Sequence, residues 1–117
     1  MNINVREREG VTILDIEGKI IGHDALDLKR VIDEILSTKK EGEVKLLLNL
    51  AKVPMMDSSG LGVIVAAYTS VQRKKGKIAL LNLGKNINNL IVMAKLITIF
   101  QRYDDEDTAI AELNKDD

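Results

Sequence analysis

The stretch MDSSGLG at residues 56–62 follows the nearly continuous apolar run VKLLLNL at residues 44–50. A short, continuous apolar run is typical of a β-strand that is covered on both faces. Asp and Ser are preferred N-cap residues, so residues 57–59 predict the start of a helix, which the RKKG at residues 73–76 should end. A buried strand followed by a helix is the repeating unit of α/β proteins with parallel strands.

Strands and helices also alternate on both sides of this unit. Toward the N-terminus, β-rich runs at residues 3–5 and 11–16 flank REREG and predict a hairpin. Apolar residues at spacings of three and four predict an amphipathic helix over residues 24–38, with Asp24 as its N-cap. Toward the C-terminus, the pattern predicts a strand at 77–83, a helix at 85–96, a short strand at 97–100 and a weak helix at 108–113.

These elements predict the α/β class: an N-terminal β-hairpin, then alternating strands and helices, forming a mixed sheet flanked by about four helices. At 117 residues, the chain is long enough for one domain with its own core, and we take residues 1–117 as that domain. Its last part, about residues 104–117, is an acidic tail with seven acids and one Lys.

The composition excludes several functions. Because the chain has no Cys, it cannot form disulfides, thiolate zinc sites or iron–sulfur clusters. A net charge of −1 and an aromatic content of 3% argue against direct binding of nucleic acid. The N-terminus lacks an apolar signal-peptide core, and no apolar stretch is long enough to span a membrane. We therefore expect a cytoplasmic protein without a membrane partner.

Catalytic motifs are also missing from the sequence. The single His23 cannot form a multi-histidine metal site, and a hydrolase using Ser58 or Ser59 would need a G-x-S-x-G elbow, which the chain lacks. The GLG at residues 60–62 lacks the third glycine of a dinucleotide-binding fingerprint. We expect no metal, no cofactor and no enzymatic activity.

Helix capping explains much of MDSSGLG, because Asp and Ser side chains accept hydrogen bonds from the free amides of a first helical turn. It leaves unexplained the two glycines, which cost about 1 kcal/mol each inside a helix. They indicate the close approach of another molecule or of a neighbouring backbone. A phosphate on Ser58 or Ser59 would also be favourable at a helix N-terminus, so either serine could act as a switch.

The octapeptide MDSSGLGV at residues 56–63 resembles the signature of the anti-sigma factor antagonists of the STAS domain family. The order of predicted elements from Ile3 to Phe100 resembles the fold of that family, so the resemblance covers essentially the whole chain. Further matches are Gly18 after the second strand, the LNL at residues 48–50 and the KIAL at residues 77–80.

The resemblance implies that the chain binds an anti-sigma factor that is also a serine kinase, and so releases a sigma factor. It also implies that the kinase phosphorylates Ser58, that the modified protein lets go, and that a metal-dependent serine phosphatase resets it. Asp57 matches the family's acid before the serine. The partner-binding turn implied by the match consists of Asp57, Ser59, Gly60, Leu61 and Gly62.

The sequence departs from the family between residues 19 and 24. Family members often carry an acid directly after the glycine that matches Gly18 and another two positions later, but here Lys19 and Ile21 occupy those positions. Asp24 is the acid that we assign to partner contact. An alternative function is that of a STAS scaffold or accessory subunit in a signalling assembly or beside a transporter, in which the serine turn is only a docking cap.

Overall fold

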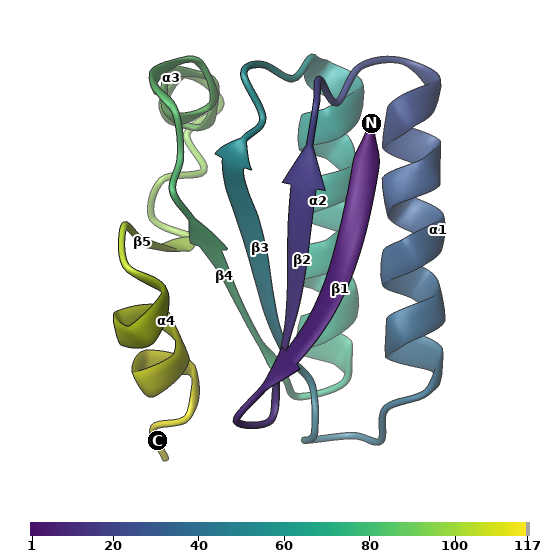
Figure 1. The fold of residues 1–117 in the computed structure, drawn as a ribbon, viewed down its shortest axis with the longest axis vertical. Coiled ribbons are helices and arrows are strands. Elements are labelled where there is room, and N and C mark those ends of the chain that lie inside the picture. Colours follow the sequence, from purple (N-terminus) through teal and green to yellow (C-terminus); the bar gives the residue numbers. More distant parts are fainter. Residues whose placement is uncertain (117) are drawn as a thin grey trace.

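Five strands form one mixed sheet in the computed structural model, which describes residues 1–116 (Figure 1). The strands lie in the order of the sequence; β1 and β2 are antiparallel, and each later pair is parallel. This confirms the α/β class, the mixed sheet and the N-terminal hairpin. The strands are β1 Asn2–Arg8, β2 Val11–Glu17, β3 Lys45–Lys52, β4 Lys77–Leu81 and β5 Gln101–Tyr103. The helices are α1 His23–Ser37, α2 Ser58–Arg73, α3 Lys85–Met93 and α4 Glu106–Leu113.

A two-residue turn closes the hairpin. Glu9 and Gly10 both have positive φ, at 51° and 80°, which is the backbone of a type I′ turn. This turn matches the right-handed twist of the flanking strands and sets the register that pairs Arg8 with Val11. β1 pairs only with β2 and lies at the edge of the sheet.

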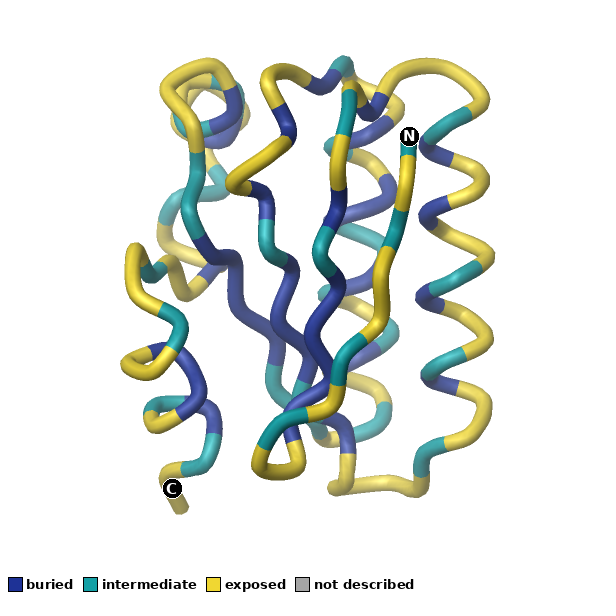
Figure 2. Tube along the Cα trace, in the orientation of Figure 1, coloured by how far each residue is buried: buried dark blue, intermediate teal, exposed yellow. Residues whose placement is uncertain are grey.

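The sheet has helices on both faces, because successive side chains of its central strands point to opposite sides. Leu14, Leu48 and Leu80 lie opposite one another and face the main core, which α1 and α2 cover. Ile13, Leu47 and Ala79 form the next register row and face a smaller core beneath α4. Figure 2 shows these strands buried along their central part. Burial on both faces explains the continuous apolar run of β3.

The N-cap predicted for the first helix is wrong. α1 begins at His23, and its N-cap is Gly22, which has φ 54° and provides no side-chain cap. Asp24 is instead the second helical residue, and within residues 1–116 its carboxylate has no hydrogen-bond or ion-pair partner. The positive φ of Gly22 favours glycine and lets the chain turn directly from the preceding loop into the helix.

The C-terminal boundaries also differ from the prediction. The third helix ends at Met93, and the last strand is Gln101–Tyr103 rather than residues 97–100. Phe100 is buried in the main core, where its ring packs edge-on against Tyr68 with the centroids 5.6 Å apart, so this apolar stretch fills space instead of pairing. The last helix starts at Glu106, because the Asp105 side chain accepts from the backbone N–H of Thr108 at 2.8 Å.

Ion pairs attach the acidic C-terminal helix to the edge strand. Arg6 of β1 donates to Asp15 at 2.6 Å and to Glu106 of α4 at 2.5 Å. Arg8 donates to Glu106 at 2.8 Å and to Asp107 at 2.5 Å. The hydrogen bonds from Arg6 lower the pKa of both Asp15 and Glu106. The part of the acidic tail in α4 is therefore folded onto the sheet.

Acid should weaken this attachment. Carboxyl groups whose folded pKa is lowered stabilise the fold fully above their unfolded pKa of about 4, and this stabilisation is lost as the pH falls through the lower folded value. We expect Arg6→Gln to cost about 1 kcal/mol of unfolding free energy at neutral pH and to flatten the loss of stability below about pH 4. Urea unfolding at a series of pH values measures both effects. An acid dependence equal to that of the wild type would contradict the role of Arg6.

Candidate functional site

The loops that follow β2 and β3 meet at one end of the sheet and form a single hydrogen-bonded unit (Figure 1). The backbone N–H of Gly18 donates to the carbonyl oxygen of Lys52 at 3.0 Å. The N–H of Ile20 donates to the Met55 oxygen at 3.1 Å, and the N–H of Asp57 donates back to the Ile20 oxygen at 3.3 Å. The parallel ladder between β2 and β3 is thus continued by this pairing up to the start of α2.

Asp57 connects the N-termini of two helices. It is the N-cap of α2, and its carboxylate accepts from the backbone N–H of Gly60 at 3.1 Å. The other carboxylate oxygen accepts from the N–H of Gly22, the N-cap residue of α1, at 3.2 Å. The backbone N–H groups of Gly60 and Gly22 lower the pKa of Asp57. Asp57 therefore stays ionised at neutral pH and holds the two loops together.

The two glycines of the motif have different surroundings. A Cβ on Gly60 would lie 2.8 Å from the carbonyl oxygen of Ile20, so the neighbouring backbone fills the space beside it. A Cβ on Gly62 would meet nothing within 4 Å, and that residue is exposed. The close approach expected from the sequence is therefore made at Gly60 by the chain itself, whereas the surface at Gly62 is open.

The two serines are the first two residues of α2, and both are exposed. Within residues 1–116, neither hydroxyl has a hydrogen-bond partner, because the capping bond comes from Asp57. Both hydroxyls are therefore free for reaction at the positive end of a helix dipole. Leu61 is half-buried and packs against the main core, so part of its role is structural.

Sequence reasoning missed a group of apolar side chains around this turn. Ile21 and Met55 come from the two paired loops and are 38% and 36% exposed, and Leu26 on α1 is 61% exposed. Ile21 and Leu26 occupy the N′ and N4 positions of α1, where an apolar pair often fixes the entry of the chain into a helix. That spacing is visible in the sequence once the helix start is placed at His23 rather than at Asp24.

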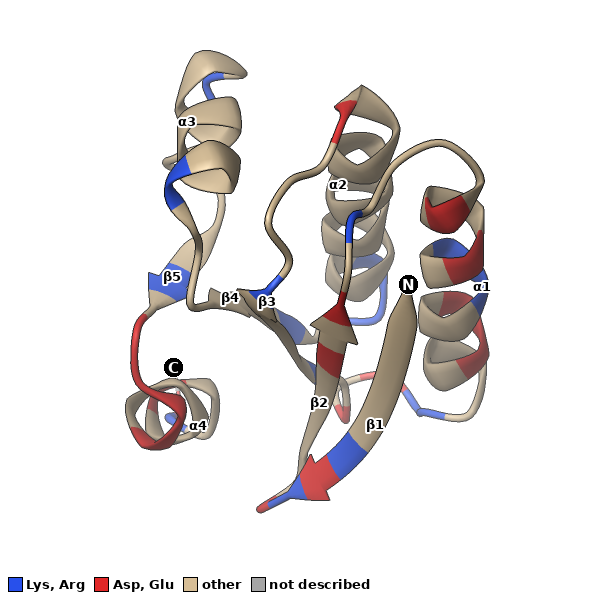
Figure 3. Ribbon diagram, turned by 45° about the horizontal axis from the view of Figure 1, so that its top comes forward, with Lys and Arg blue, Asp and Glu red and all other residues tan. Residues whose placement is uncertain are grey.

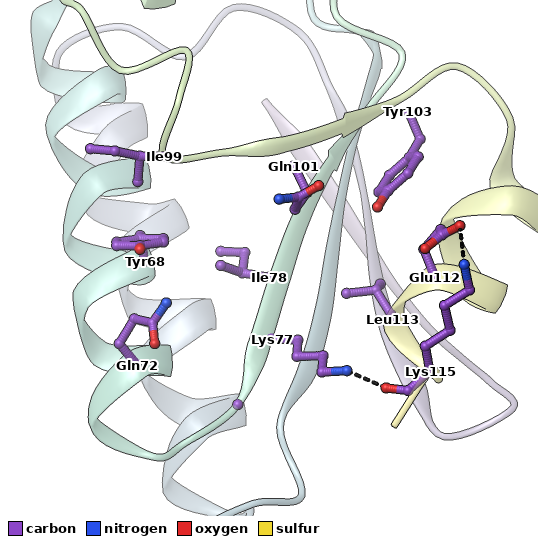
Figure 4. Close-up of a pocket in the computed structure, with 11 residues that line it drawn as sticks. Tyr68, Gln72, Lys77, Ile78, Ile99, Gln101, Tyr103, Glu112, Leu113 and Lys115 are labelled. Atoms are coloured by element: carbon purple, nitrogen blue, oxygen red, sulfur yellow. Dashed lines mark hydrogen bonds and ion pairs between the residues drawn. The ribbon is translucent and has the colours of Figure 1, made fainter. Parts of the chain in front are cut away.

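A well-formed hollow in the described residues lies away from the motif. A hollow of about 460 Å³ opens between the C-terminal half of α2, β4, β5 and α4 (Figure 4). Tyr68, Ile99 and Tyr103 contribute to its lining, but neither serine of the motif nor His23 does. In the described part of the chain, no hydrogen bond joins His23 to Ser58 or Ser59, and no group of three or more His, Cys, Asp or Glu residues could hold a metal ion. Over the same residues, no helix combines the length and apolarity needed to cross a membrane.

The contrast between the glycines gives a matched pair of variants. Gly60→Ala places a methyl group against the Ile20 carbonyl and should cost about 1–3 kcal/mol of unfolding free energy. Gly62→Ala adds the same methyl group in open space on a helix and should stabilise the protein by about 0.5–1 kcal/mol. Chemical denaturation of both variants measures the difference, and equal effects would show that the two loops are not held against each other.

Comparisons with known proteins point in the same direction as the motif. A family model described as the STAS domain matches residues 2–109. The anti-sigma F factor antagonist of Paenibacillus polymyxa is 29% identical over 113 residues, which cover 97% of this chain and 95% of that protein.

Solved structures share the fold. The crystal structure of the Thermotoga maritima protein TM1081 has a TM-score of 0.88 at 27% identity and covers 97% of this chain and 95% of its own. SpoIIAA of Bacillus in its phosphorylated form has a TM-score of 0.75 at 17% identity and covers 97% of this chain and all of its own, a likeness in fold. These findings confirm the family indicated by MDSSGLGV. The chain, whose two paired loops hold the serine turn at the end of the sheet, belongs to the STAS domain family.

Proposed function

We propose that this protein is an anti-sigma factor antagonist that binds an anti-sigma factor serine kinase and so releases a sigma factor. Phosphorylation of Ser58 switches it off, and a metal-dependent serine phosphatase resets it. The observation that carries the proposal is the Ser58 hydroxyl, which is exposed and unpartnered within the described residues on a turn that Asp57 holds in place. The name of the Paenibacillus relative supports the same function.

The geometry of the turn suits a residue that is modified by another protein. A kinase must hold the acceptor hydroxyl close to the γ-phosphate of ATP, and a turn fixed at both helix N-termini presents the hydroxyl with little loss of freedom on binding. Gly62 and Ser59 beside it are exposed, so the partner's backbone can come close. The chain then acts as a substrate and a binding partner in the cytoplasm, without cofactor or catalytic residues of its own.

The same geometry explains how a phosphate would switch the protein. A phosphoserine adds about −1.5 to −2 charges at neutral pH, directly beside the ionised Asp57. The first amides of α2 and its dipole favour this charge, so the fold tolerates it. A partner surface that had docked on the neutral turn would have to desolvate the phosphate, and binding is lost. SpoIIAA, which shares this fold, is known in phosphorylated and unphosphorylated forms.

The acceptor can be tested with adjacent serines as matched variants. With the anti-sigma factor kinase of the same organism and ATP, the wild type should gain one phosphate. Ser58→Ala should gain none, whereas Ser59→Ala should still be phosphorylated, because only Ser58 is the proposed acceptor. Intact-protein mass spectrometry reads the result. Undiminished phosphate incorporation by Ser58→Ala would show that the acceptor has been assigned to the wrong residue.

The switch itself can be tested by charge alone. Ser58→Asp places a carboxylate at the first position of α2 and should weaken binding to the kinase by about tenfold or more, while Ser58→Ala should bind nearly as well as the wild type. Isothermal titration calorimetry with the purified kinase measures both affinities. If Ser58→Asp binds as tightly as the wild type, negative charge at this turn is not what releases the partner.

The alternative of a scaffold or accessory subunit predicts a different outcome. In that case Ser58 serves only as part of a docking cap, and removing its hydroxyl leaves the activity of the protein in cells unchanged. Transcription from the promoters of the proposed sigma factor, measured in wild type, Ser58→Ala and Ser58→Asp, separates the two, because the alternative predicts no change in either variant. The proposed function requires that Ser58→Asp lower this transcription.

A further inference from the structure

The solvent face of α3 differs from that of an ordinary surface helix. Its exposed residues recur at spacings of three and four and are Lys85, Asn86, Asn89, Val92 and Met93. Met93 is 81% exposed and Val92 is 45% exposed. On α1, by contrast, the exposed positions are mostly charged and include the ion pairs of Lys29 with Asp33 and of Arg30 with Asp27. Together with Lys95 just beyond the helix, these five exposed residues form what we call the α3 face.

Acidic and basic residues are distributed unevenly along the chain, and this distribution sets the charge of the α3 face. All 18 Asp and Glu residues lie outside residues 58–103, a segment that runs from α2 to β5. The same segment carries seven basic residues, which are Arg73, Lys74, Lys75, Lys77, Lys85, Lys95 and Arg102. Figure 3 shows the result: α1 and α4 carry red acidic positions, whereas α3 carries blue positions and no red. The α3 face is therefore apolar and basic.

The α3 face lies at the same end of the molecule as the Ser58 turn. The loops before α1, α2 and α3 follow β2, β3 and β4, and the carboxyl ends of parallel strands share one edge of the sheet. Figures 1 and 3 both show α3 at the end where α2 begins. A partner that docks on Ser58 and spreads over this end would meet the α3 face.

We propose that the α3 face is a second contact surface for the protein that recognises Ser58. The matching surface of that partner is an apolar pocket for Met93 and Val92, bordered by acidic residues opposite Lys85 and Lys95. This rests on the proposed function. The charge of the face selects an acidic protein: two lysines, each contributing about 1 kcal/mol at an anionic lipid surface, are too few to hold this domain on a membrane.

The second contact also accounts for the direction of the switch. An acidic partner surface is attracted to the lysines of the α3 face while Ser58 is unmodified. A phosphate on Ser58 adds to the negative charge of Asp57 at the same end of the molecule and opposes the attraction. Release therefore needs no change in the fold of the antagonist, because the added charge acts directly on the partner.

The experiment compares substitutions on the α3 face with matched substitutions elsewhere. Met93→Ser removes the exposed apolar side chain, and Val5→Ser, on β1, is its control, since Val5 is 48% exposed. Lys95→Glu reverses a charge on the face, and Lys40→Glu makes the same change in the exposed loop after α1, at the opposite end of the molecule. Circular dichroism and thermal unfolding verify that each variant is folded.

Binding to the purified anti-sigma factor kinase should weaken by about tenfold in Met93→Ser and in Lys95→Glu, and by less than about twofold in the two controls. Added salt should weaken binding of the wild type more than that of Lys95→Glu, because screening acts on the attraction that the variant has lost. In Met93→Ser and Lys95→Glu, the KM for phosphorylation of Ser58 should rise, and the rate at a saturating concentration of this protein should not change, because the face is separate from the reacting hydroxyl.

Two kinds of outcome distinguish this inference from the proposed function. If the wild type neither binds the kinase nor accepts phosphate, the proposed function fails. If the wild type binds and all four variants bind equally well, only the α3 contact is overturned. The wild type could also bind vesicles of phosphatidylcholine and phosphatidylserine, or dimerise. If Met93→Ser abolished either behaviour, the proposal that an acidic protein covers the α3 face would be overturned.

Discussion

The hydrogen bonds of the Asp57 carboxylate are the interaction on which the end of the molecule that carries the serine turn depends. The carboxylate accepts from the N–H of Gly60 and from the N–H of Gly22. One side chain therefore caps α2 and also restrains the loop that precedes α1. Around it, the carbonyl of Ile20 lies against Gly60, in space that a larger residue would need. The backbone of the serine turn is therefore held from both sides.

Most of the acidic residues of the protein lie away from the segment that contains Ser58 and α3. Arg6 and Arg8 hold the C-terminal acids Glu106 and Asp107 against the edge strand, on the face opposite α1 and α2. The acids of the first half lie in the hairpin, α1 and the loops. Residues 58–103, which include Ser58 and α3, are left without a carboxylate, and a phosphate on Ser58 would add to the charge of Asp57 at this end.

Much of this could be predicted from local pattern. The continuous apolar run of β3 predicted a strand buried on both faces, and residues 57–59 predicted the start of α2, where the structure makes Asp57 the N-cap. The predictions failed where no strong local signal exists. Gly22 replaces Asp24 as N-cap because a glycine backbone conformation, rather than a side chain, starts α1. Residues 97–100 resemble a strand because they are largely apolar, but in the structure Phe100 packs on Tyr68 in the core and is not part of a strand.

The sequence by itself determined the α/β class, the order of the elements, the family and the serine turn, because periodicity and capping act over a few residues. The tertiary structure decided that a side chain has no room at Gly60 but has room at Gly62. It also decided that Asp57 accepts from the N–H of Gly22 in addition to that of its own helix, and that Val92 and Met93 remain exposed on α3. These depend on contacts between residues that lie tens of positions apart. The paired ends of β2 and β3 bring Gly22, Asp57 and Gly60 together, and the packing of α3 on the core decides which of its apolar side chains stay exposed.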